Sequence, residues 1–367
     1  MNHWFKINNT NNLISPSLLV YPDRIKKNIQ LMIETAGGTE YLRPHIKTHK
    51  MAEVIKLQLN AGIYKFKCAT IAEAELLAEC GAKDILLAMQ LVAIDIIRFF
   101  ALIKKYPESI FSTLVDNIKS AKEFSHMAEI EKIKISFWMD INNGMNRTGI
   151  EPDKQAIELY KSIEIDKNLI AKGFHVYDGH IHNSNLEERT HVCNKYFEPV
   201  LKLQNDLENL GIKIKTIIAG GTPTFPIHKN RKDVETSPGT PLLWDAGYAK
   251  KYKDLKFLPA AVLFTRVVSK PKKNLACFDL GHKSVASEMP LPRIKFLELD
   301  NCKQIGQSEE HLIIESENNK FNIGDAAYAI PIHICPTVSK YKKAITVVDN
   351  EVTGSWEVAA RDQQRII

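Results

Sequence analysis

The sequence has few cysteines and no long apolar run. Six cysteines occur among 367 residues, without a CxxC pair, which argues against a disulfide framework or a zinc ribbon. No stretch approaches the ~18 consecutive apolar residues that a membrane-spanning helix requires. The first residues, MNHWFKINNTNNLISPSLLV, lack the apolar core of a secretory signal. From these absences we expect a cytoplasmic globular protein with reduced thiols and no membrane partner.

Charge of one sign does not dominate the chain either. The formal net charge is +6, from 49 basic and 43 acidic residues, and the two signs are mixed along the whole sequence. A protein that binds nucleic acid usually has a basic block or stripe, so we do not expect nucleic acid as a partner. The length is sufficient for one large barrel or for two domains with substantial cores.

Short apolar runs alternate with longer amphipathic segments from about residue 39 to 246. The strand-like runs are EYLRP, YKFKCAT, DILLAMQ, STLVD, KISFWMDI, IAKGFHVYDGH, KTIIAGG and PLLWDAG. Helix-like segments lie between most of them, although residues 225–239 show no clear helical pattern. This number of βα units predicts a TIM-like (β/α)8 barrel, whose active site lies at the carboxyl ends of the strands. Polar side chains that follow the expected strands should line that face: His45, Lys47, Gln90, Asp116, Arg147, His180, His182, Thr222 and Asp245.

The pattern changes after about residue 255. Short β-like runs such as AAVLFTRVVSKP and RIKFLELD follow one another, separated by turn residues, as in a β-rich domain. We therefore predict an α/β fold with a barrel over residues 15–254 and a β-rich domain over residues 255–367. Residues 1–14 are expected to pack with the β-rich domain.

The segment YLRPHIKTHK concentrates basic side chains where a strand is expected to meet a helix. Lys47 has four basic or imidazole neighbours in this segment: Arg43, His45, His49 and Lys50. Nearby like charges disfavour the ammonium form of a lysine, which leaves a nucleophilic amine suited to Schiff-base chemistry. A solvated helix start explains the same residues equally well, so this segment alone leaves both interpretations open.

Two glycine-containing segments also follow expected strands. In AGGTPTF, paired glycines next to Thr222 allow backbone N–H groups to approach an anion such as phosphate. In NNGMNRTGI, Arg147 can hold an anionic oxygen. A tight βα turn and a surface arginine are the simpler alternatives.

Two further segments contain candidate metal ligands. YDGHIH places His180 and His182 on one face of an expected strand, as a zinc pair of a hydrolytic barrel or as polar residues at the barrel mouth. PIHICPTVS places His333 and Cys335 in the same relation, and imidazole with thiolate favours zinc over magnesium or calcium. A buried cysteine and a capping histidine are the alternative for the second pair.

Taken in order, the segments RPHIKTHK, GMNRTG, YDGHIH, GGTPTF, SPGT…DAGY and PIHICPT resemble the D-threonine aldolase / D-serine dehydratase family. These are pyridoxal-phosphate (PLP) enzymes of the alanine-racemase fold type. The resemblance covers nearly the whole chain. It implies an amino-terminal barrel, a carboxyl-terminal β domain, and usually a homodimer with sites at the domain boundary.

The resemblance implies a role for individual residues. Lys47 matches the lysine that forms the Schiff base with PLP. The matched contacts of the cofactor are Arg147, Tyr177, Gly221, Thr222 and Tyr248. His333 and Cys335 match a metal pair, for which we expect zinc before manganese or magnesium. The residues expected only to line the site are His45, Gln90, His180 and His182.

The resemblance also implies a small D-3-hydroxy amino acid as substrate. In the aldolase interpretation the Cα–Cβ bond breaks, so D-threonine gives glycine and acetaldehyde. In the dehydratase interpretation Lys47 takes the Cα proton and the metal helps the hydroxyl leave, so D-serine gives pyruvate and ammonia. Cys335 favours the zinc-dependent dehydratase, because aldolases of the family tend to have aspartate there.

The wider pattern, including KFKCATIAEAELLA and GHKSVASEMPLPR, resembles sequences grouped with D-threonine aldolases. We therefore expect the aldolase reaction, with the dehydratase as the alternative. An amino-acid racemase is less favoured, because the second acid–base residue it needs is not evident in the sequence. A non-catalytic PLP-binding protein is also less favoured, because it explains neither the β domain nor the pair His333 and Cys335.

Overall fold

The structure, a computed structural model, describes residues 3–299, 302–317 and 321–363. Contacts between Cα atoms divide the chain into two compact units. The β unit comprises Met1–Leu31, Thr48–Val54 and Thr240–Arg361, and the barrel unit comprises Met32–Lys47, Ile55–Gly239 and Asp362–Ile367. Two helices contribute residues to both units, α1 (Pro22–Ala36) and α2 (Ala52–Asn60). Within the described residues, no helix is long and apolar enough to cross a membrane.

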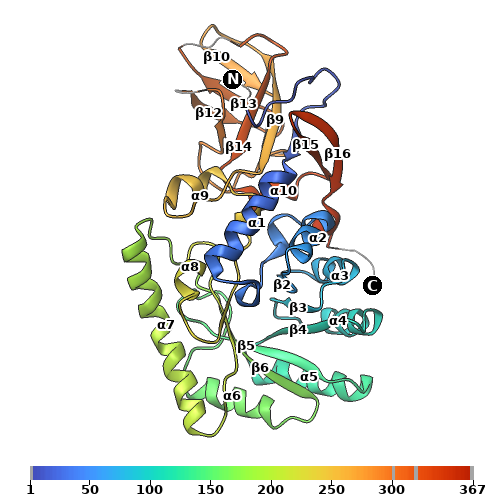
Figure 1. Cartoon of the computed structure of the whole chain (residues 1–367), viewed down its shortest axis with the longest axis vertical. Helices are drawn as coiled ribbons and strands as arrows, with labels where there is room; N and C mark the ends of the chain where they lie inside the picture. The colour runs from blue at the N-terminus through green and yellow to red at the C-terminus, as the bar shows by residue number, and fades with distance from the viewer. Residues whose placement is uncertain (1–2, 300–301, 318–320, 364–367) are drawn as a thin grey trace. The chain divides into compact units, whose positions relative to one another are not determined.

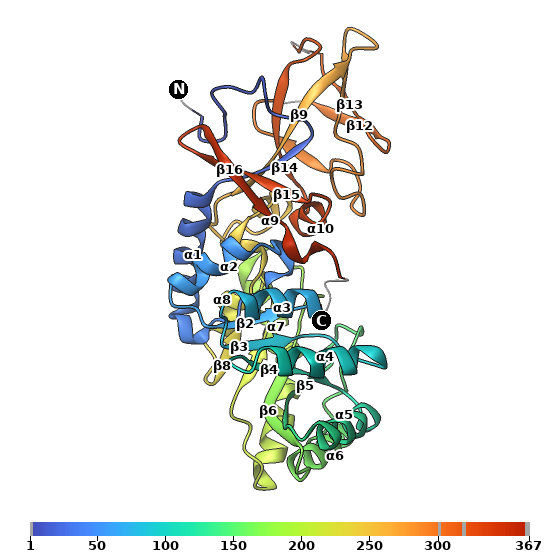
Figure 2. The same cartoon turned by 90° about the vertical axis from the view of Figure 1, so that its right-hand side faces the viewer.

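In the described part of the barrel unit, seven parallel strands pair in sequence order (Figure 1). They are β2 (Lys65–Cys68), β3 (Asp84–Leu87), β4 (Ile110–Val115), β5 (Ile135–Asp140), β6 (Leu169–Val176), β7 (Ile217–Ala219) and β8 (Val234–Thr236). The helices between them are α3 (Ile71–Glu79), α4 (Ile94–Lys105), α5 (Ile118–Glu131), α6 (Lys154–Glu164), α7 (Leu186–Asn209) and α8 (Phe225–His228). Figure 2 shows α3 to α6 following one another along the outside of the strands, as expected for repeated βα units.

An irregular segment, residues 42–45, takes the place of an eighth strand. Leu42 forms a parallel bridge with β8, and His45 forms one with β2. The N–H of Lys67 donates to the carbonyl of Pro44 at 2.9 Å, but Pro44 has no N–H with which to extend a ladder. The prediction of a strand at EYLRP is therefore wrong, because Glu40 and Tyr41 belong to the 3-10 helix η1 (Thr39–Tyr41) and Leu42 forms a single bridge.

The end of the barrel sequence also differs from the prediction. The segment PLLWDAG, predicted as a strand, contains the 3-10 helix η3 (Thr240–Leu242) and the start of α9 (Ala246–Lys251). Asp245 caps α9, because its side chain accepts a hydrogen bond from the N–H of Tyr248 at 2.8 Å. The last strand, β8, lies instead in the stretch that had shown no clear helical pattern.

The β unit contains a mixed sheet in which β1 (Ser17–Val20) pairs antiparallel with β9 (Ala261–Ser269) and parallel with β15 (Lys343–Val348). Its other strands are β10 (Leu275–Phe278), β11 (Ile294–Phe296), β12 (Lys303–Gln307), β13 (Leu312–Glu315), β14 (Ala326–Pro331) and β16 (Glu351–Glu357). Besides η3 and α9, this unit contains the short helices α10 (Ile334–Val338) and η4 (Ala359–Arg361). Residues from both ends of this unit's sequence share one apolar core: Phe5, Ile7, Leu19, Tyr21, Val262, Phe264, Tyr328 and Val347.

Candidate functional site

Lys47 lies directly after the irregular segment that closes the barrel. It belongs to the 3-10 helix η2 (Ile46–Thr48). The backbone N–H of Lys47 donates to Nδ1 of the buried His45 at 3.3 Å. Because the bridges of this segment are parallel to β2 and β8, Lys47 lies at the carboxyl ends of the strands, where barrels carry their sites.

Three basic side chains surround the ring of Tyr177, which follows β6. Nζ of Lys47 lies 5.8 Å from the ring centroid, Nζ of Lys67 lies 5.7 Å from it, and Cζ of Arg147 lies 4.9 Å from it. The structure thus brings together three of the residues selected from the sequence. It adds Lys67, which sequence reasoning missed.

Lys67 is a buried lysine on β2. Burial lowers its pKa to about 7, and the neighbouring charge of Lys47 acts in the same direction, although Asp140 and Asp178 oppose it. The segment KFKC contains a signal for this residue. Lys65 and Lys67 are two apart on a strand and so face the same side, where barrel interiors usually hold branched apolar residues.

Arg43, expected as a charged neighbour of Lys47, is instead paired with two carboxylates. Its fully buried guanidinium binds Asp84 through two hydrogen bonds of 2.7 and 3.1 Å, and Glu235 through one of 2.8 Å. Lys65 binds the same Glu235 at 2.5 Å. Asp84 begins β3, so these paired charges lie toward the amino ends of the strands.

His49 is not a charged neighbour of Lys47 either. It is completely buried, and burial together with the charge of Lys50 lowers its pKa to about 3. His49 is therefore a neutral imidazole at physiological pH. Lys47 and Lys67 both lie within 6 Å of the centroid of the Tyr177 ring, and the charge of Lys47 lowers the pKa of Lys67.

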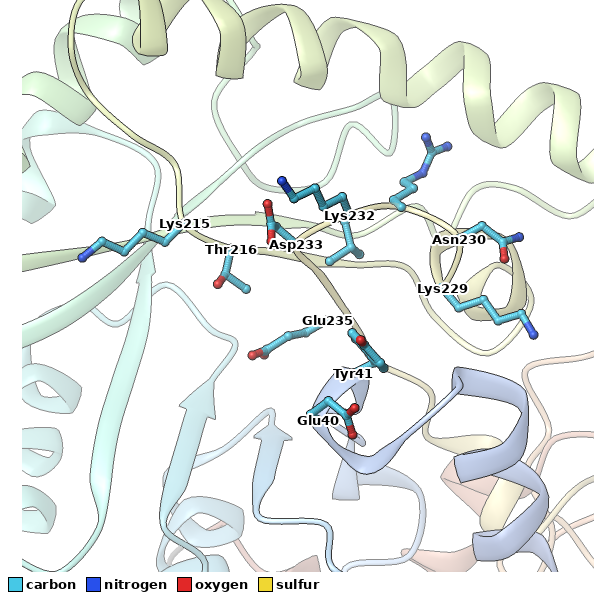
Figure 3. A pocket seen from close by; sticks show the side chains of 11 residues that line it. Glu40, Tyr41, Lys215, Thr216, Lys229, Asn230, Lys232, Asp233 and Glu235 are labelled. Atoms are coloured by element: carbon cyan, nitrogen blue, oxygen red, sulfur yellow. The ribbon is translucent and has the colours of Figure 1, made fainter.

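A pocket of about 480 Å³ opens at the amino ends of β7 and β8 (Figure 3). Its lining includes Lys215, Lys232, Asp233 and Glu235, and contains none of the predicted site residues. Glu235 already pairs with basic residues of the barrel interior. This end of a barrel generally serves stability rather than chemistry, so we do not assign the pocket a ligand.

Arg147 is held by a closed loop after β5. Ile141 and Ile150 form a parallel bridge at its base. Gly149 has a φ of +97°, and a Cβ at this position would lie 2.6 Å from the backbone nitrogen of Asn142. Only glycine fits such a position, so the sequence GMNRTG fixes the path of the backbone that carries Arg147.

A carboxylate at the base of this loop holds the predicted Gln90. The amide of Gln90 donates to Oδ2 of Asp140 at 2.6 Å, and Oδ1 of Asp140 lies 2.7 Å from Nδ1 of His175. Burial opposes ionisation of Asp140, but its hydrogen bonds with these partners and with Thr148 outweigh burial and lower its pKa. Gln90 is thus oriented by Asp140, which the sequence analysis did not select.

The glycine turn after β7 lies beside Tyr177. A Cβ on Gly221 would lie 3.2 Å from the Tyr177 ring. The hydroxyl of the buried Thr222 accepts a hydrogen bond from the N–H of Gly239 at 3.3 Å. The predicted anion-binding turn and the three basic groups are therefore parts of one region of the barrel unit.

The two histidines of YDGHIH do not form a pair. β6 ends at Val176, so both lie on a loop rather than on the predicted strand. The ring of His180 packs edge-on against Tyr196, with centroids 4.6 Å apart, whereas His182 is exposed. Among the described residues, neither ring nitrogen of His180 has a hydrogen-bond partner. The premise of a zinc pair on one strand face is wrong, and His180 is the better placed to meet a ligand.

His333 and Cys335 also differ from their predicted setting. β14 ends at Pro331, and His333 is the N-cap residue of α10, in which Cys335 lies. The two side chains are nevertheless joined by a hydrogen bond. This bond is the largest of the effects that raise the pKa of His333 to about 9. Nδ1 of His333 lies 2.5 Å from Glu288, and Oγ1 of Thr48 lies 3.0 Å from Sγ of Cys335.

Asp245 connects this pair to the predicted Tyr248. Its Oδ2 accepts a hydrogen bond from the N–H of Ile334 at 3.1 Å, while Oδ1 caps the helix that carries Tyr248. Burial raises the pKa of Asp245 to about 6. Tyr248 itself packs against the ring of Trp244 at 5.8 Å between centroids. Tyr248, His333 and Cys335 belong to the β unit, whereas the basic group around Tyr177 belongs to the barrel unit.

Comparison with known proteins gives matches along almost the entire chain. Residues 20–243 match the model of the alanine racemase N-terminal domain, and residues 260–347 match a serine dehydratase domain. A 3-hydroxy-D-aspartate aldolase from Paracoccus denitrificans (strain Pd 1222) is 26% identical over 95% of this chain and 92% of the relative. A D-threonine aldolase from Arthrobacter sp is 25% identical over 96% and 93%, and a D-serine dehydratase from Dictyostelium discoideum is 25% identical over 95% and 97%.

A solved structure shows the same arrangement of elements. The crystal structure of D-threonine aldolase from Filomicrobium marinum superimposes with a TM-score of 0.87 at 23% identity, covering 95% of both chains. This similarity establishes a parallel, TIM-like barrel with a mixed β-rich domain, as the sequence predicted.

Proposed function

The chain belongs to the family of the alanine racemase N-terminal domain, and from this premise we propose that it is a PLP-dependent lyase that cleaves D-3-hydroxy amino acids by a retro-aldol reaction. D-threonine would give glycine and acetaldehyde. The lyase class rests on aldolase and dehydratase relatives that match more than nine-tenths of the chain. The resemblance predicted from the sequence motifs is thereby confirmed.

The observation that carries the cofactor assignment is the basic group around Tyr177. Lys47, Lys67 and Arg147 all lie within 6 Å of this one ring, and the turn at Gly221 lies beside it. PLP carries a phosphate and a phenolic oxygen, so it offers the negative charge that these groups require. The residues present therefore fit the cofactor.

Each of these residues has a distinct proposed task. Lys47 would hold the cofactor through its amine, and the same amine would hold or move a proton at Cα of the substrate. Arg147 holds an anionic oxygen, and the loop closed by Gly149 keeps it in place. Tyr177 supplies the ring surface between the basic groups. When bound there, PLP supplies the electron sink for bond cleavage at Cα.

We further propose that His333 and Cys335 hold a divalent metal, zinc before manganese or magnesium. Imidazole with thiolate is a typical zinc donor set. The carboxylate of Glu288, 2.5 Å from Nδ1 of His333, is the kind of partner that orients a metal-binding imidazole. A metal at these donors supplies a Lewis acid for the 3-hydroxyl of the substrate.

The second candidate is the dehydration of D-serine to pyruvate and ammonia. It is favoured by Cys335 as a zinc-type thiol donor and by the D-serine dehydratase relative from Dictyostelium discoideum. From the family resemblance we also propose a cytoplasmic homodimer that acts on a small D-amino acid and binds neither nucleic acid nor membrane. Both reactions use the same residues, so products must distinguish them.

A product assay tests the proposal. Purified protein with PLP and zinc chloride is incubated with D-threonine, D-serine or 3-hydroxy-D-aspartate, with L-threonine as the stereochemical control. Glycine from D-threonine, with equimolar acetaldehyde and without ammonia, is the expected result. Ammonia from D-serine without glycine from D-threonine would replace the aldolase with the dehydratase.

A further inference from the structure

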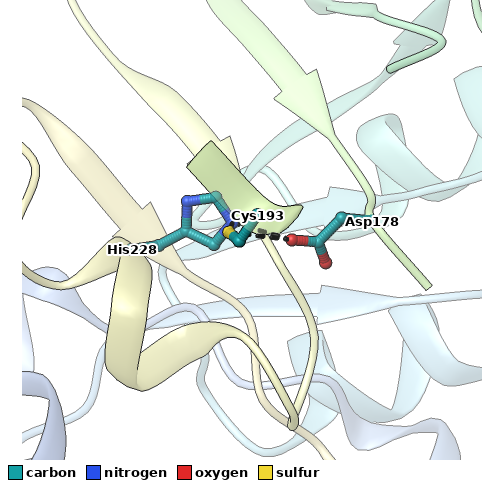
Figure 4. Close-up of side chains that lie close together, drawn as sticks. All are labelled: Asp178, Cys193 and His228. Carbon is teal, nitrogen blue, oxygen red and sulfur yellow. Dashed lines mark hydrogen bonds and ion pairs between the residues drawn. The ribbon is translucent and has the colours of Figure 1, made fainter. Parts of the chain in front are cut away.

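Three potential metal ligands of the barrel unit lie close together (Figure 4). Asp178 follows β6, Cys193 lies on α7, and His228 ends α8, and all three are buried. Nε2 of His228 lies 2.8 Å from Oδ2 of Asp178 and 3.4 Å from Sγ of Cys193. Such a set either binds a metal ion or forms a hydrogen-bonded network.

Arg231 favours the hydrogen-bonded network. Its Nε donates to Nδ1 of His228 at 3.2 Å, so the proton of this imidazole lies on Nε2 and is donated to Asp178. A metal at Nε2 would move that proton to Nδ1, where it would face the N–H of Arg231.

Thr224 connects this network to the glycine turn. Its hydroxyl donates to Oδ1 of Asp178 at 2.7 Å and accepts from the N–H of Gly221 at 3.2 Å. Both carboxylate oxygens of Asp178 are thus engaged, one by Thr224 and one by His228. The backbone of the turn is thereby tied to a buried carboxylate.

Steric contact restricts the same turn. Gly220 has a φ of +77°, and a Cβ there would lie 2.7 Å from Cδ2 of His228 and 2.8 Å from Oγ1 of Thr224. The turn therefore packs directly on the two side chains that Asp178 holds. Asp178 also directly follows Tyr177 in the sequence, so its backbone continues from the residue around which the basic side chains lie.

We propose that Asp178, Thr224 and His228 form a clamp that fixes the Gly220–Gly221 turn in the conformation that binds the phosphate of PLP. They are positioning residues, because they act through the backbone of the turn. This inference rests on the proposed function, since it assumes PLP as the ligand. It excludes a metal at Asp178, Cys193 and His228.

The test compares PLP with pyridoxal, which has the same ring and aldehyde but no phosphate. Equilibrium dialysis gives both dissociation constants for the wild type, Thr224→Val and Thr224→Ser. Thr224→Val removes the hydroxyl at nearly constant volume and leaves the Gly221 N–H unpaired. We expect it to weaken PLP binding about tenfold, or ~1.4 kcal/mol, and pyridoxal binding less than about threefold. Thr224→Ser should restore the wild-type ratio of the two constants.

Cys193→Ser is the matched control. It changes a side chain that touches Asp178 and His228 but not the turn, so the ratio of the two constants should stay as in the wild type. Equal losses for PLP and pyridoxal in Thr224→Val, or no loss, overturn the clamp. Stoichiometric zinc binding that Cys193→Ser abolishes while His333→Ala retains it establishes a metal site instead. A wild type that binds neither compound refutes the proposed function and the clamp together.

Discussion

Lys65 and Lys67 lie two residues apart on the same face of β2, yet their surroundings are opposite. Lys65 binds the carboxylate of Glu235 at 2.5 Å, and Glu235 also binds Arg43. Lys67 faces the ring of Tyr177 together with two other basic groups. Toward the amino end of the barrel the charges are paired, whereas toward the carboxyl end positive charges gather. The two ends of the strand therefore differ. We call the amino half, with its paired charges, the structural half, and the carboxyl half, with the basic group around Tyr177, the proposed ligand-binding half.

The largest expected effect concerns the ligand-binding half. Lys47→Ala should abolish the lyase reaction, by more than about 10³-fold, because the amine that carries the cofactor is lost. Absorbance of the PLP-loaded protein in the ~400–430 nm range expected for a lysine-bound cofactor should disappear as well. Lys65→Ala serves as the lysine control on the structural half and should retain this band. Retention of the band in Lys47→Ala would move the covalent role to another lysine, with Lys67 the first to examine.

The next largest effect concerns the paired charges of the structural half. Arg43→Met should lower the free energy of unfolding by ~3–5 kcal/mol, because removing one partner of a buried ion pair leaves the charge of Asp84 uncompensated. Glu235 would keep Lys65 as its basic partner. Urea denaturation followed by circular dichroism measures this loss. Arg147→Met, the equivalent change in the ligand-binding half, should cost the cofactor-free protein much less. Equal losses would contradict the division between the two halves.

Substitution of Lys67 should raise the stability of the cofactor-free protein, in contrast to Arg43→Met, and the size of the gain should depend on pH. The pKa of Lys67 is about 7 in the folded protein against an ordinary 10.5. Protonation of Lys67 therefore costs no stability above about pH 10.5, but the cost grows as the pH falls and is complete below about pH 7. Lys67→Met should therefore stabilise the cofactor-free protein at pH 7, by at most ~5 kcal/mol, and by less at pH 9. Lys65→Met is the matched control and should destabilise it. Thermal unfolding at the two pH values measures both, and a gain that does not shrink with pH would refute this account of Lys67.

The smallest effect concerns the proposed metal pair. Glu288→Gln removes the charge that faces Nδ1 of His333 and should weaken zinc binding about 10- to 100-fold, as is usual when the partner of a metal-binding imidazole is lost. Competition with a chromogenic chelator measures the affinity. Glu298→Gln, on the same unit, is the control and should leave zinc binding unchanged. A normal affinity in Glu288→Gln would mean that this carboxylate does not orient His333.

The sequence was informative where patterns are long and repeated. The βα alternation predicted the barrel, and Lys47, Arg147 and Tyr177 were selected from motifs that the structure brings around one ring. Short segments were misread, because helix and strand periods are indistinguishable over a few residues. His333 and Cys335 thus lie at a helix start instead of on a strand, and the segment with Pro44 forms bridges instead of a strand.

The remaining residues were missed because their meaning depends on tertiary contacts. Asp178 lies in the selected segment YDGHIH, but His228 is 50 residues away from it, and no spacing connects the two. From the sequence alone Lys67 is an ordinary strand residue, because its lowered pKa results from burial and from the nearby charge of Lys47. Arg43 was assigned to the wrong neighbourhood, because proximity in sequence to Lys47 gave no indication that its side chain points toward the opposite end of the barrel.

The irregular segment before Lys47 has a consequence for folding. Its bridge partners are Thr236, almost two hundred positions later in the chain, and Lys67. Contacts across such long loops are costly to form and tend to be made late. Lys47 therefore reaches its place only when the first and last parts of the barrel have met. The chain would then bind the cofactor only after the barrel has formed, and an incompletely folded chain would leave the aldehyde of PLP in solution.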